Sequence, residues 1–463
     1  MKFAPAVLAE HGLTDSFVPP YPERVTRNLQ PWEYLWRAHK NLLSFFHVAD
    51  FQNRDIAQTL FRRRFVLTNR PAGVRETLTD QHAAFERKNA IQRVALKPLL
   101  GDGLFVSDGE TWAERRAAVD PIIHGRRVKD FGPIMSDVAR EWCEDWGSDD
   151  GATRDILFEM GEMTAEVISR TIFGTKLGRE ATQKIIAGFA TYQANVRAVS
   201  AVLLRLPGPL GRPLTKKGRR AKDEIHAVID NLIDRLAGER GEPAVVRSLF
   251  AATDRNGAPL TREAIRNEAI VLFMAGHETT ANTLAWALYL VSQSPRVAER
   301  LRDEFAAVLD GRHPTLSDVA ALTYTRAVIE ETLRLYPPVP ILAREATAPG
   351  TLGDDRLAPG DVLVVSPWLL QRNPDIYSLP DHFIPERFTG LLGPRPRKHA
   401  NIPFAAGPRT CPGRIFALAE ASICLAALLQ RFEVTLNPGT HVAVDCRLTL
   451  RPTAPLSMTV TKR

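Results

Sequence analysis

The sequence predicts a mainly α-helical protein with small peripheral β-sheets, built as a single domain over residues 1–463 with residues 1–70 as its N-terminal segment. Apolar residues recur at helical spacing along most of the chain, whereas strand-like alternation is short and rare. A length of 463 residues would allow about three domains. However, the most Pro/Gly-rich stretches, 207–213 and 394–408, are short and lie between patterned segments, and no repeat or low-complexity tract divides the chain.

The helical pattern is strongest in eight segments, of which one is apolar on nearly all sides. The eight segments are 108–118, 160–173, 179–203, 220–236, 261–293, 296–309, 319–335 and 412–431. Residues 264–291 carry so few polar positions that we expect a helix buried by the rest of the protein. Pro295 follows this segment and marks its end.

Strand signals are weak and lie at the periphery of the helical segments. Residues 361–365 follow an Ala-Pro-Gly turn, and residues 458–460 alternate near the C-terminus. Residues 57–68 form a mixed candidate before Pro71. These signals predict small sheets beside a helical body.

Composition and charge exclude several classes of protein. Hydrophobic residues make up 44% and charged residues 24% of the chain, which excludes a disordered, collagen-like or coiled-coil protein. The net charge of +7 is spread over short runs such as 62–64 and 216–220, so a nucleic-acid-binding surface is not expected. The basic excess is either ordinary solvated surface or a docking surface for an acidic partner protein.

Cysteine use and the N-terminus indicate a soluble, cytoplasmic protein. The four cysteines form no C-x-x-C pair and no zinc spacing, as expected in a reducing compartment. Residues 1–17 contain charged positions and lack the apolar run of a signal peptide or a transmembrane anchor.

One loop presents a cysteine directly before a predicted helix. The segment from Phe404 to Gly413 reads FAAGPRTCPG, with Cys411 just ahead of an apolar helical pattern. A helix N-terminus stabilises a thiolate, and free backbone N–H groups such as that of Gly413 can donate hydrogen bonds to the sulfur. The alternative is an inert buried cysteine, which we expect for the other three cysteines: Cys143, Cys424 and Cys446.

The loop F-x-x-G-x-R-x-C-x-G resembles the haem-binding loop of the cytochromes P450, the haem-thiolate monooxygenases. The resemblance implies the fold of that family, with haem b as the cofactor and Cys411 as the ligand of its iron. It also implies that Phe404, Arg409 and Gly413 lie at the cofactor.

A second motif, AGHETT at residues 275–280, interrupts the long apolar helix. The Thr279 hydroxyl can donate a hydrogen bond to the carbonyl of Ala275 and bend the helix, so one interpretation is a kink without chemistry. The motif resembles the oxygen-activation motif of the cytochromes P450, which implies that Glu278 and Thr279 deliver protons. His277 lacks the second histidine of an H-E-x-x-H zinc motif, so we expect a structural histidine there.

Two further motifs supply a charge network. Glu331 and Arg334 lie three residues apart on one predicted helix and can pair there, although such pairs are usually surface ion pairs of little energy. The segment FIPERF at 383–388 provides Arg387. In the cytochromes P450 these three charges lock together and brace the cysteine loop, so the resemblance implies a structural role for them.

The segment WAERR contains Trp112 and Arg116 and resembles the W-x-x-x-R helix whose side chains contact a haem propionate. Arg409 and Arg344 are the other expected propionate partners, because the guanidinium fork matches a carboxylate. Arg344 has the alternative of being a surface cation.

The resemblance implies a monooxygenase that uses O2 to hydroxylate or epoxidise a hydrophobic small molecule such as a fatty acid, terpenoid or steroid. Phe273, Met274 and Ala275 are expected in the substrate pocket, and residues 201–213 are expected to form an access lid. Because only 52 residues follow Cys411, electrons should come from a separate ferredoxin- or flavodoxin-type donor, with NAD(P)H acting only through a reductase. The alternatives are a peroxide-driven or oxygen-independent haem-thiolate enzyme and a haem-thiolate sensor.

Overall fold

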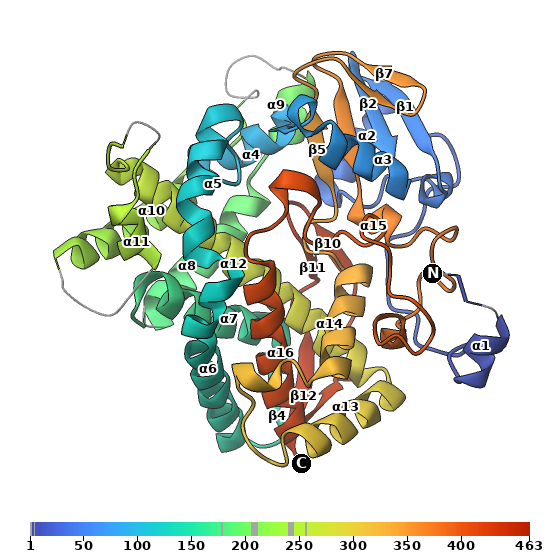
Figure 1. Cartoon of the computed structure of the whole chain (residues 1–463), viewed down its shortest axis with the longest axis vertical. Coiled ribbons are helices and arrows are strands. Elements are labelled where there is room, and N and C mark those ends of the chain that lie inside the picture. Colours follow the sequence, from blue (N-terminus) through green and yellow to red (C-terminus); the bar gives the residue numbers. More distant parts are fainter. Residues whose placement is uncertain (1, 4, 177–178, 205–211, 239–244, 255–256) are drawn as a thin grey trace.

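The computed structural model describes the whole chain apart from residues 1, 4, 177–178, 205–211, 239–244 and 255–256. One long helix, α12 (Arg262–Ser292), runs through the middle of the molecule (Figure 1). Thr261 begins it, because its side chain accepts a hydrogen bond from the N–H of Ala264. Nearly all of its residues are buried, since α12 packs against α7 (Ile156–Phe173), α14 (Thr323–Leu335) and α16 (Arg414–Arg431). The prediction of a buried helix at 261–293 is therefore confirmed.

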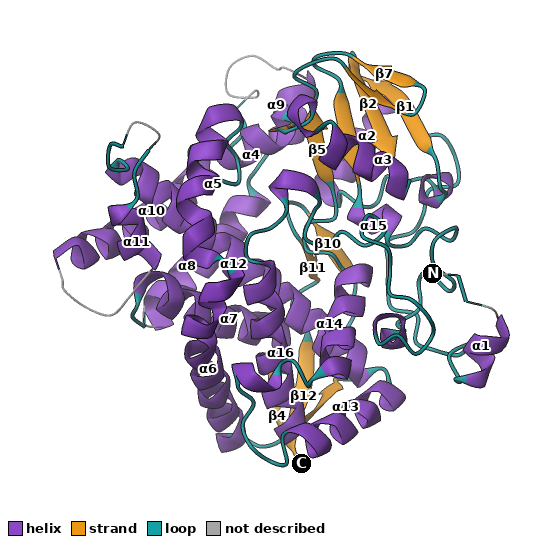
Figure 2. Ribbon diagram, viewed as in Figure 1, coloured by secondary structure: helices purple, strands orange, loops and turns teal. Residues whose placement is uncertain are grey.

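The remaining helices confirm the mainly helical fold class (Figure 2). They are α1 (Pro5–Glu10), α2 (Pro31–Lys40), α3 (Pro71–Arg75), α4 (Ala90–Leu100), α5 (Gly109–Ile123), α6 (Val128–Ser148), α8 (Arg179–Ala194), α9 (Ala198–Leu204), α10 (Lys216–Gly238), α11 (Val245–Ala251), α13 (Pro295–Val308) and α15 (Pro367–Leu370). Within the described parts of the chain, none of the helices has the length and apolar character needed to cross a membrane.

The largest sheet joins strands from residues 55–88 with strands from residues 342–365. Its strands lie in the order β1 (Asp55–Leu60), β2 (Arg63–Thr68), β8 (Val362–Val365), β5 (Leu342–Glu345) and β3 (Arg87–Lys88). Strands β2 and β8 are parallel, and the other neighbours are antiparallel. In this register Lys88 on β3 lies opposite Arg344 on β5. A pairing between residues so far apart in sequence places two cations side by side.

Smaller sheets complete the periphery, as the short strand signals predict. One has the order β4 (Ala152–Asp155), β12 (Ser457–Lys462) and β9 (Phe432–Leu436); β10 (Val444–Cys446) pairs with β11 (Leu450–Pro452), and β6 (Gly350–Leu352) pairs with β7 (Asp355–Leu357). The mixed segment 57–68 falls within the β1–β2 hairpin.

The segment predicted as one helix over 179–203 is two helices. Helix α8 ends at Ala194, and α9 begins at Ala198. Between them Val196 forms a β-bridge with Leu214, and the N–H of Arg197 donates to the carbonyl of Pro213. These tertiary contacts turn the chain where the apolar pattern is continuous. Most of the predicted access lid, 205–211, lies outside the described residues.

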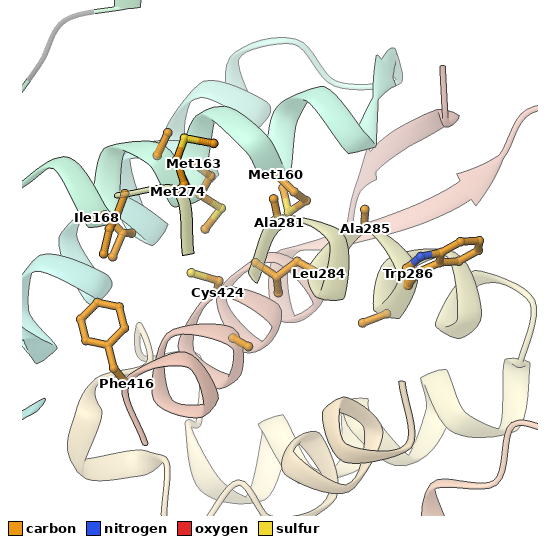
Figure 3. Close-up of a cluster of buried hydrophobic side chains, with 14 of the residues drawn as sticks. Met160, Met163, Ile168, Met274, Ala281, Leu284, Ala285, Trp286, Phe416 and Cys424 are labelled. Carbon is orange, nitrogen blue, oxygen red and sulfur yellow. The ribbon is translucent and has the colours of Figure 1, made fainter. Parts of the chain in front are cut away.

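The core lies where α7, α12 and α16 meet (Figure 3). Met160 of α7 lies beside Ala281 of α12, and Met163 lies beside Met274. Leu284 lies on the side of α12 that faces α16, where Cys424 is. Gly276 allows α7 to approach α12 closely: a Cβ at this position would lie 2.6 Å from Cδ1 of Ile168. This packing fixes the middle of α12, where the AGHETT motif lies.

Candidate functional site

The cysteine loop is folded tightly by its own backbone. The N–H of Cys411 donates to the carbonyl of Phe404 over 2.9 Å, and the N–H of Thr410 donates to the carbonyl of Gly407 over 3.0 Å. Gly407 has φ +71°, and a Cβ there would lie 1.8 Å from the carbonyl oxygen of Leu78. Only glycine fits this position, because both the conformation and the space exclude a side chain.

Cys411 lies three residues before Arg414, the first residue of α16, and its side chain is exposed, unlike those of Cys143, Cys424 and Cys446. Desolvation by the surrounding protein raises the pKa of the Cys411 thiol, while a hydrogen bond from the Gly413 N–H and the charges of Arg116 and Arg414 act in the opposite direction. These three contacts all stabilise the thiolate, which is the form that binds a metal.

Three buried cations gather beside the loop: Lys88, Arg344 and Arg409. Burial and the charge of Arg409 lower the pKa of Arg344 to about 10, and burial with both arginines lowers the pKa of Lys88. Burial likewise lowers the pKa of Arg409 to about 10. In the part of the chain that the structure describes, the one carboxylate within ion-pair distance of the three is that of Glu86, 3.8 Å from Arg409. Such a group of cations is suited to a ligand that carries carboxylates, as the haem propionates do.

Trp112 and Arg116 connect α5 to the same loop. The Arg409 guanidinium lies over the Trp112 ring, 4.6 Å from its centroid, and its Nη2 donates to the carbonyl of Ser107. Arg116 Nη1 donates to the carbonyl of Thr410 over 2.9 Å, next to Cys411. The structure thus brings Trp112, Arg116, Arg344 and Arg409 to one side of the cysteine loop.

Glu331 lies at the centre of a fully buried charge network. Its two oxygens accept from Arg334 Nε at 2.6 Å and Nη2 at 2.8 Å, and Oε1 also accepts from Arg387 Nε at 3.2 Å. The backbone N–H of Ile384 donates to the same oxygen over 2.9 Å. The side chains of Glu331, Arg334 and Arg387 have no exposed area. The network therefore fixes the segment around 384–387 to α14.

The middle of α12 carries the residues predicted to handle protons. Thr279 Oγ1 donates to the carbonyl of Ala275 over 2.6 Å, as the sequence predicts. The buried Glu278 accepts hydrogen bonds from Gln193 at 2.6 Å and Thr449 at 2.7 Å. His277 stacks on Phe273, and burial lowers its pKa to about 4, as expected of a packed histidine. An acid and an alcohol therefore lie next to each other on one helix.

A cavity of about 710 Å³ opens against this part of α12. Met274, Ala275, Glu278 and Thr279 contribute to its wall. Phe273 does not: its ring packs against Phe173 and His277 in the core, because it points toward α7. This corrects the prediction for Phe273. The volume lies within the range of pockets that enclose small organic ligands.

Aromatic and aliphatic side chains dominate the cavity wall. They come from α2 and α4 and the loops that follow them, from the β1–β2 hairpin, from α8 and from the segment before β5. They include Phe45, Phe65, Leu96, Phe105, Phe189 and Ile341. Residues 339–341 also line the cavity. An apolar ligand fits such a wall.

Sequence reasoning missed three residues of this site. Lys88 lies in no motif, and only its pairing with Arg344 in the sheet places it at the site. Gln193 and Thr449 lie 85 and 171 residues from Glu278, and neither belongs to a recognisable motif. No local signal could have identified them.

Comparison with known proteins identifies the arrangement. The cytochrome P450 family model matches residues 31–460. Cyclooctatin synthase of Streptomyces melanosporofaciens is 32% identical over 371 residues, which cover 78% of each chain. Cyclooctat-9-en-7-ol 5-monooxygenase of the same organism is 29% identical, with 81% of this chain and 82% of the relative covered. The crystal structure of the cytochrome P450DA haem domain superposes with a TM-score of 0.77 at 25% identity, over 88% of this chain and 90% of the other. The chain therefore belongs to the cytochrome P450 family, the haem-thiolate monooxygenases.

Proposed function

We propose that this cytochrome P450 holds haem b through Cys411 and inserts one oxygen atom from O2 into an apolar small molecule. The proposal depends on one observation: an exposed cysteine sulfur at the start of α16 lies in a loop bordered by buried cations. Haem, when bound, supplies the activation of O2. The Cys411 thiolate would hold the haem iron, and its electron density would favour the oxygen chemistry that the haem supplies.

The buried cations hold the propionates in this proposal. Arg344 and Arg409 donate through their guanidinium groups, and Lys88 adds a third positive charge. Trp112 and Arg116 complete the contact from α5, while Phe404 and Gly413 lie on the cysteine side. Glu331, Arg334 and Arg387 act at a distance by bracing the loop.

Glu278 and Thr279 deliver protons in this proposal. The Thr279 hydroxyl is held by the Ala275 carbonyl and faces the cavity, so it can pass a proton inward while Glu278 supplies it. A peroxide-driven or oxygen-independent enzyme needs no such pair. The presence of both side chains at the cavity wall favours the O2-dependent reaction over these alternatives and over a sensor.

A basic surface near Cys411 is suited to binding a small acidic electron-donor protein. Ile415 is 50% exposed and follows Arg414 at the start of α16, four residues beyond Cys411. A Cβ on Gly125 would lie 2.4 Å from the Ile415 side chain, so the exposed Arg126 lies close to it. An apolar side chain bordered by arginines suits a ferredoxin- or flavodoxin-type protein, which would receive electrons from NAD(P)H through a reductase. The sparse, free cysteines are in keeping with a cytoplasmic location.

The cavity favours a substrate of fatty-acid, terpenoid or steroid type. Its wall is mostly apolar, and Arg54 and Arg447 border it, so a molecule with one polar end fits. A screen for compounds that shift the ferric haem from low to high spin, followed by product analysis with a surrogate electron donor, tests the proposal. Oxygenated product from an apolar compound that shifts the spin state supports it. Spin-shifting compounds that are never oxygenated, under conditions that reduce the haem, would contradict it.

A further inference from the structure

The carboxyl group of Glu278 is held by two neutral hydrogen-bond donors from distant segments. Gln193 Nε2, near the end of α8, lies 2.6 Å from Oε1 of Glu278, and Thr449 Oγ1 lies 2.7 Å from the same oxygen. Thr449 belongs to the turn between β10 and β11. Both residues border the cavity. One carboxyl oxygen therefore links α12, α8 and the C-terminal segment around the cavity.

These contacts oppose the effect of burial on the carboxyl group. Burial raises the pKa of Glu278, whereas the hydrogen bonds from Thr449 and Gln193 and the charge of Arg451 lower it. Arg451 is the charged group that acts from the C-terminal segment, and α8 contributes the neutral amide of Gln193. Hydrogen bonds donated to a carboxylate favour its ionised form. The proton affinity of Glu278 is thus set by side chains outside the AGHETT motif.

Resting on the proposed function, in which Glu278 delivers protons, we propose that Gln193 and Thr449 are positioning residues that orient this carboxyl group and keep it able to ionise. A carboxyl group that stays protonated cannot take up the next proton from solvent. A carboxyl group that rotates freely loses the fixed place at the cavity wall that Gln193 and Thr449 give it. The two donors prevent both failures without touching the reacting atoms.

The test compares donor-deleting variants with matched controls in the holoenzyme. Thr449→Val removes the hydroxyl at constant shape, and Thr449→Ser restores it; Gln193→Leu removes the amide. Gln183→Leu is the control on the same helix, because Gln183 donates to Glu162 over 2.7 Å and does not border the cavity. Infrared difference titration follows the carbonyl stretch of the protonated carboxyl group, with Glu278→Gln assigning the band.

Thr449→Val and Gln193→Leu should each raise the proton affinity of Glu278 about tenfold, the effect of losing one hydrogen bond to a charged group. Both variants should also release more peroxide per electron, with an altered pH profile, while Thr449→Ser and Gln183→Leu match the wild type. The proposal would be overturned if the Glu278 titration curve were unchanged in both variants. It would also be overturned if Gln183→Leu shifted that curve equally, or if the wild-type spectrum had no band assigned to Glu278.

The outcome separates this inference from the proposed function. A wild-type protein whose reduced carbon monoxide complex lacks the thiolate signature would contradict the proposed function, whatever the titrations show. A wild-type protein with that signature, and with variants that titrate normally, would contradict only the role of Gln193 and Thr449.

Discussion

Replacing Glu331 with glutamine should destabilise the buried charge network that braces the cysteine loop. The substitution keeps the shape of the side chain and removes its charge, so Arg334 and Arg387 remain buried without a counter-ion. The glutamine amide can accept through one oxygen only, whereas the Glu331 carboxylate accepts four hydrogen bonds through two. Its Nε2 would face the donors that the second carboxyl oxygen now binds.

The magnitude follows from the burial of all three charges. Breaking a buried ion pair by removing one partner costs about 3–5 kcal/mol, because the remaining charge is left uncompensated. A whole domain is typically stable by only about 5–15 kcal/mol. Glu331→Gln should therefore lose a large part of the free energy of unfolding and should fail to incorporate haem stoichiometrically.

The assay measures haem per chain by absorbance and stability by urea denaturation. Glu330→Gln is the matched control: Glu330 is the neighbouring residue on α14, but it is partly exposed and pairs with Arg326 and Arg395 at the surface. This control should stay within about 1 kcal/mol of the wild type. If Glu331→Gln bound haem normally and unfolded at the wild-type urea concentration, the assignment of the network as the brace of the loop would be wrong.

Three further perturbations have defined outcomes. Thr279→Ala should retain haem and the substrate-induced spin shift but convert more of the consumed electrons into peroxide, whereas the control Thr283→Ala should not; an unchanged ratio of product to electrons would contradict the role of Thr279. Burial raises the pKa of Glu420 to about 8, so the folded state holds more protons than the unfolded state between about pH 4.5 and 8, and stability falls as pH rises through this range. Glu420→Gln should remove this loss, on the order of 5 kcal/mol. An identical pH dependence of the urea midpoint in variant and wild type would refute the role of Glu420. Gly407→Ala should abolish haem binding because the added Cβ would clash with the Leu78 carbonyl. The control Gly439→Ala, at φ +80° with open space around it, should suffer backbone strain alone. Equal haem content in the two variants would show that the close approach at Gly407 is unimportant.

The motifs of the site could be read from the sequence because each is local. The cysteine loop, the acid–alcohol pair on α12 and the Glu331–Arg334 pair lie within one turn or loop. The buried helix α12 is also evident from the sequence, because apolar residues occupy all of its faces. Phe273 shows the limit of such reasoning. It lies close in sequence to the motif that lines the cavity, but its side chain is on the face of α12 that packs against α7.

Contacts between distant segments could not be predicted. Lys88 reaches Arg344 through a two-residue strand that has no alternation to reveal it. The apolar pattern over 179–203 continues through the break at 195–197, which the pairing of Val196 with Leu214 imposes. Helix α6 has Gly132 and Pro133 in its first turns, which obscure its start in the sequence. In the first two cases tertiary contacts override the local pattern, whereas in α6 the Gly132-Pro133 pair itself interrupts the helical pattern.

The bond between Cys411 and a haem iron is most directly tested by the absorption spectrum of the reduced protein under carbon monoxide. The wild type and the control Cys143→Ser, in which a buried thiol that donates to the Ala427 carbonyl is replaced, should both show the red-shifted band of thiolate ligation. Cys411→Ser should lose that band. A wild-type protein without the band, or a Cys411→Ser variant that keeps it, would contradict the assignment of Cys411 as the haem ligand.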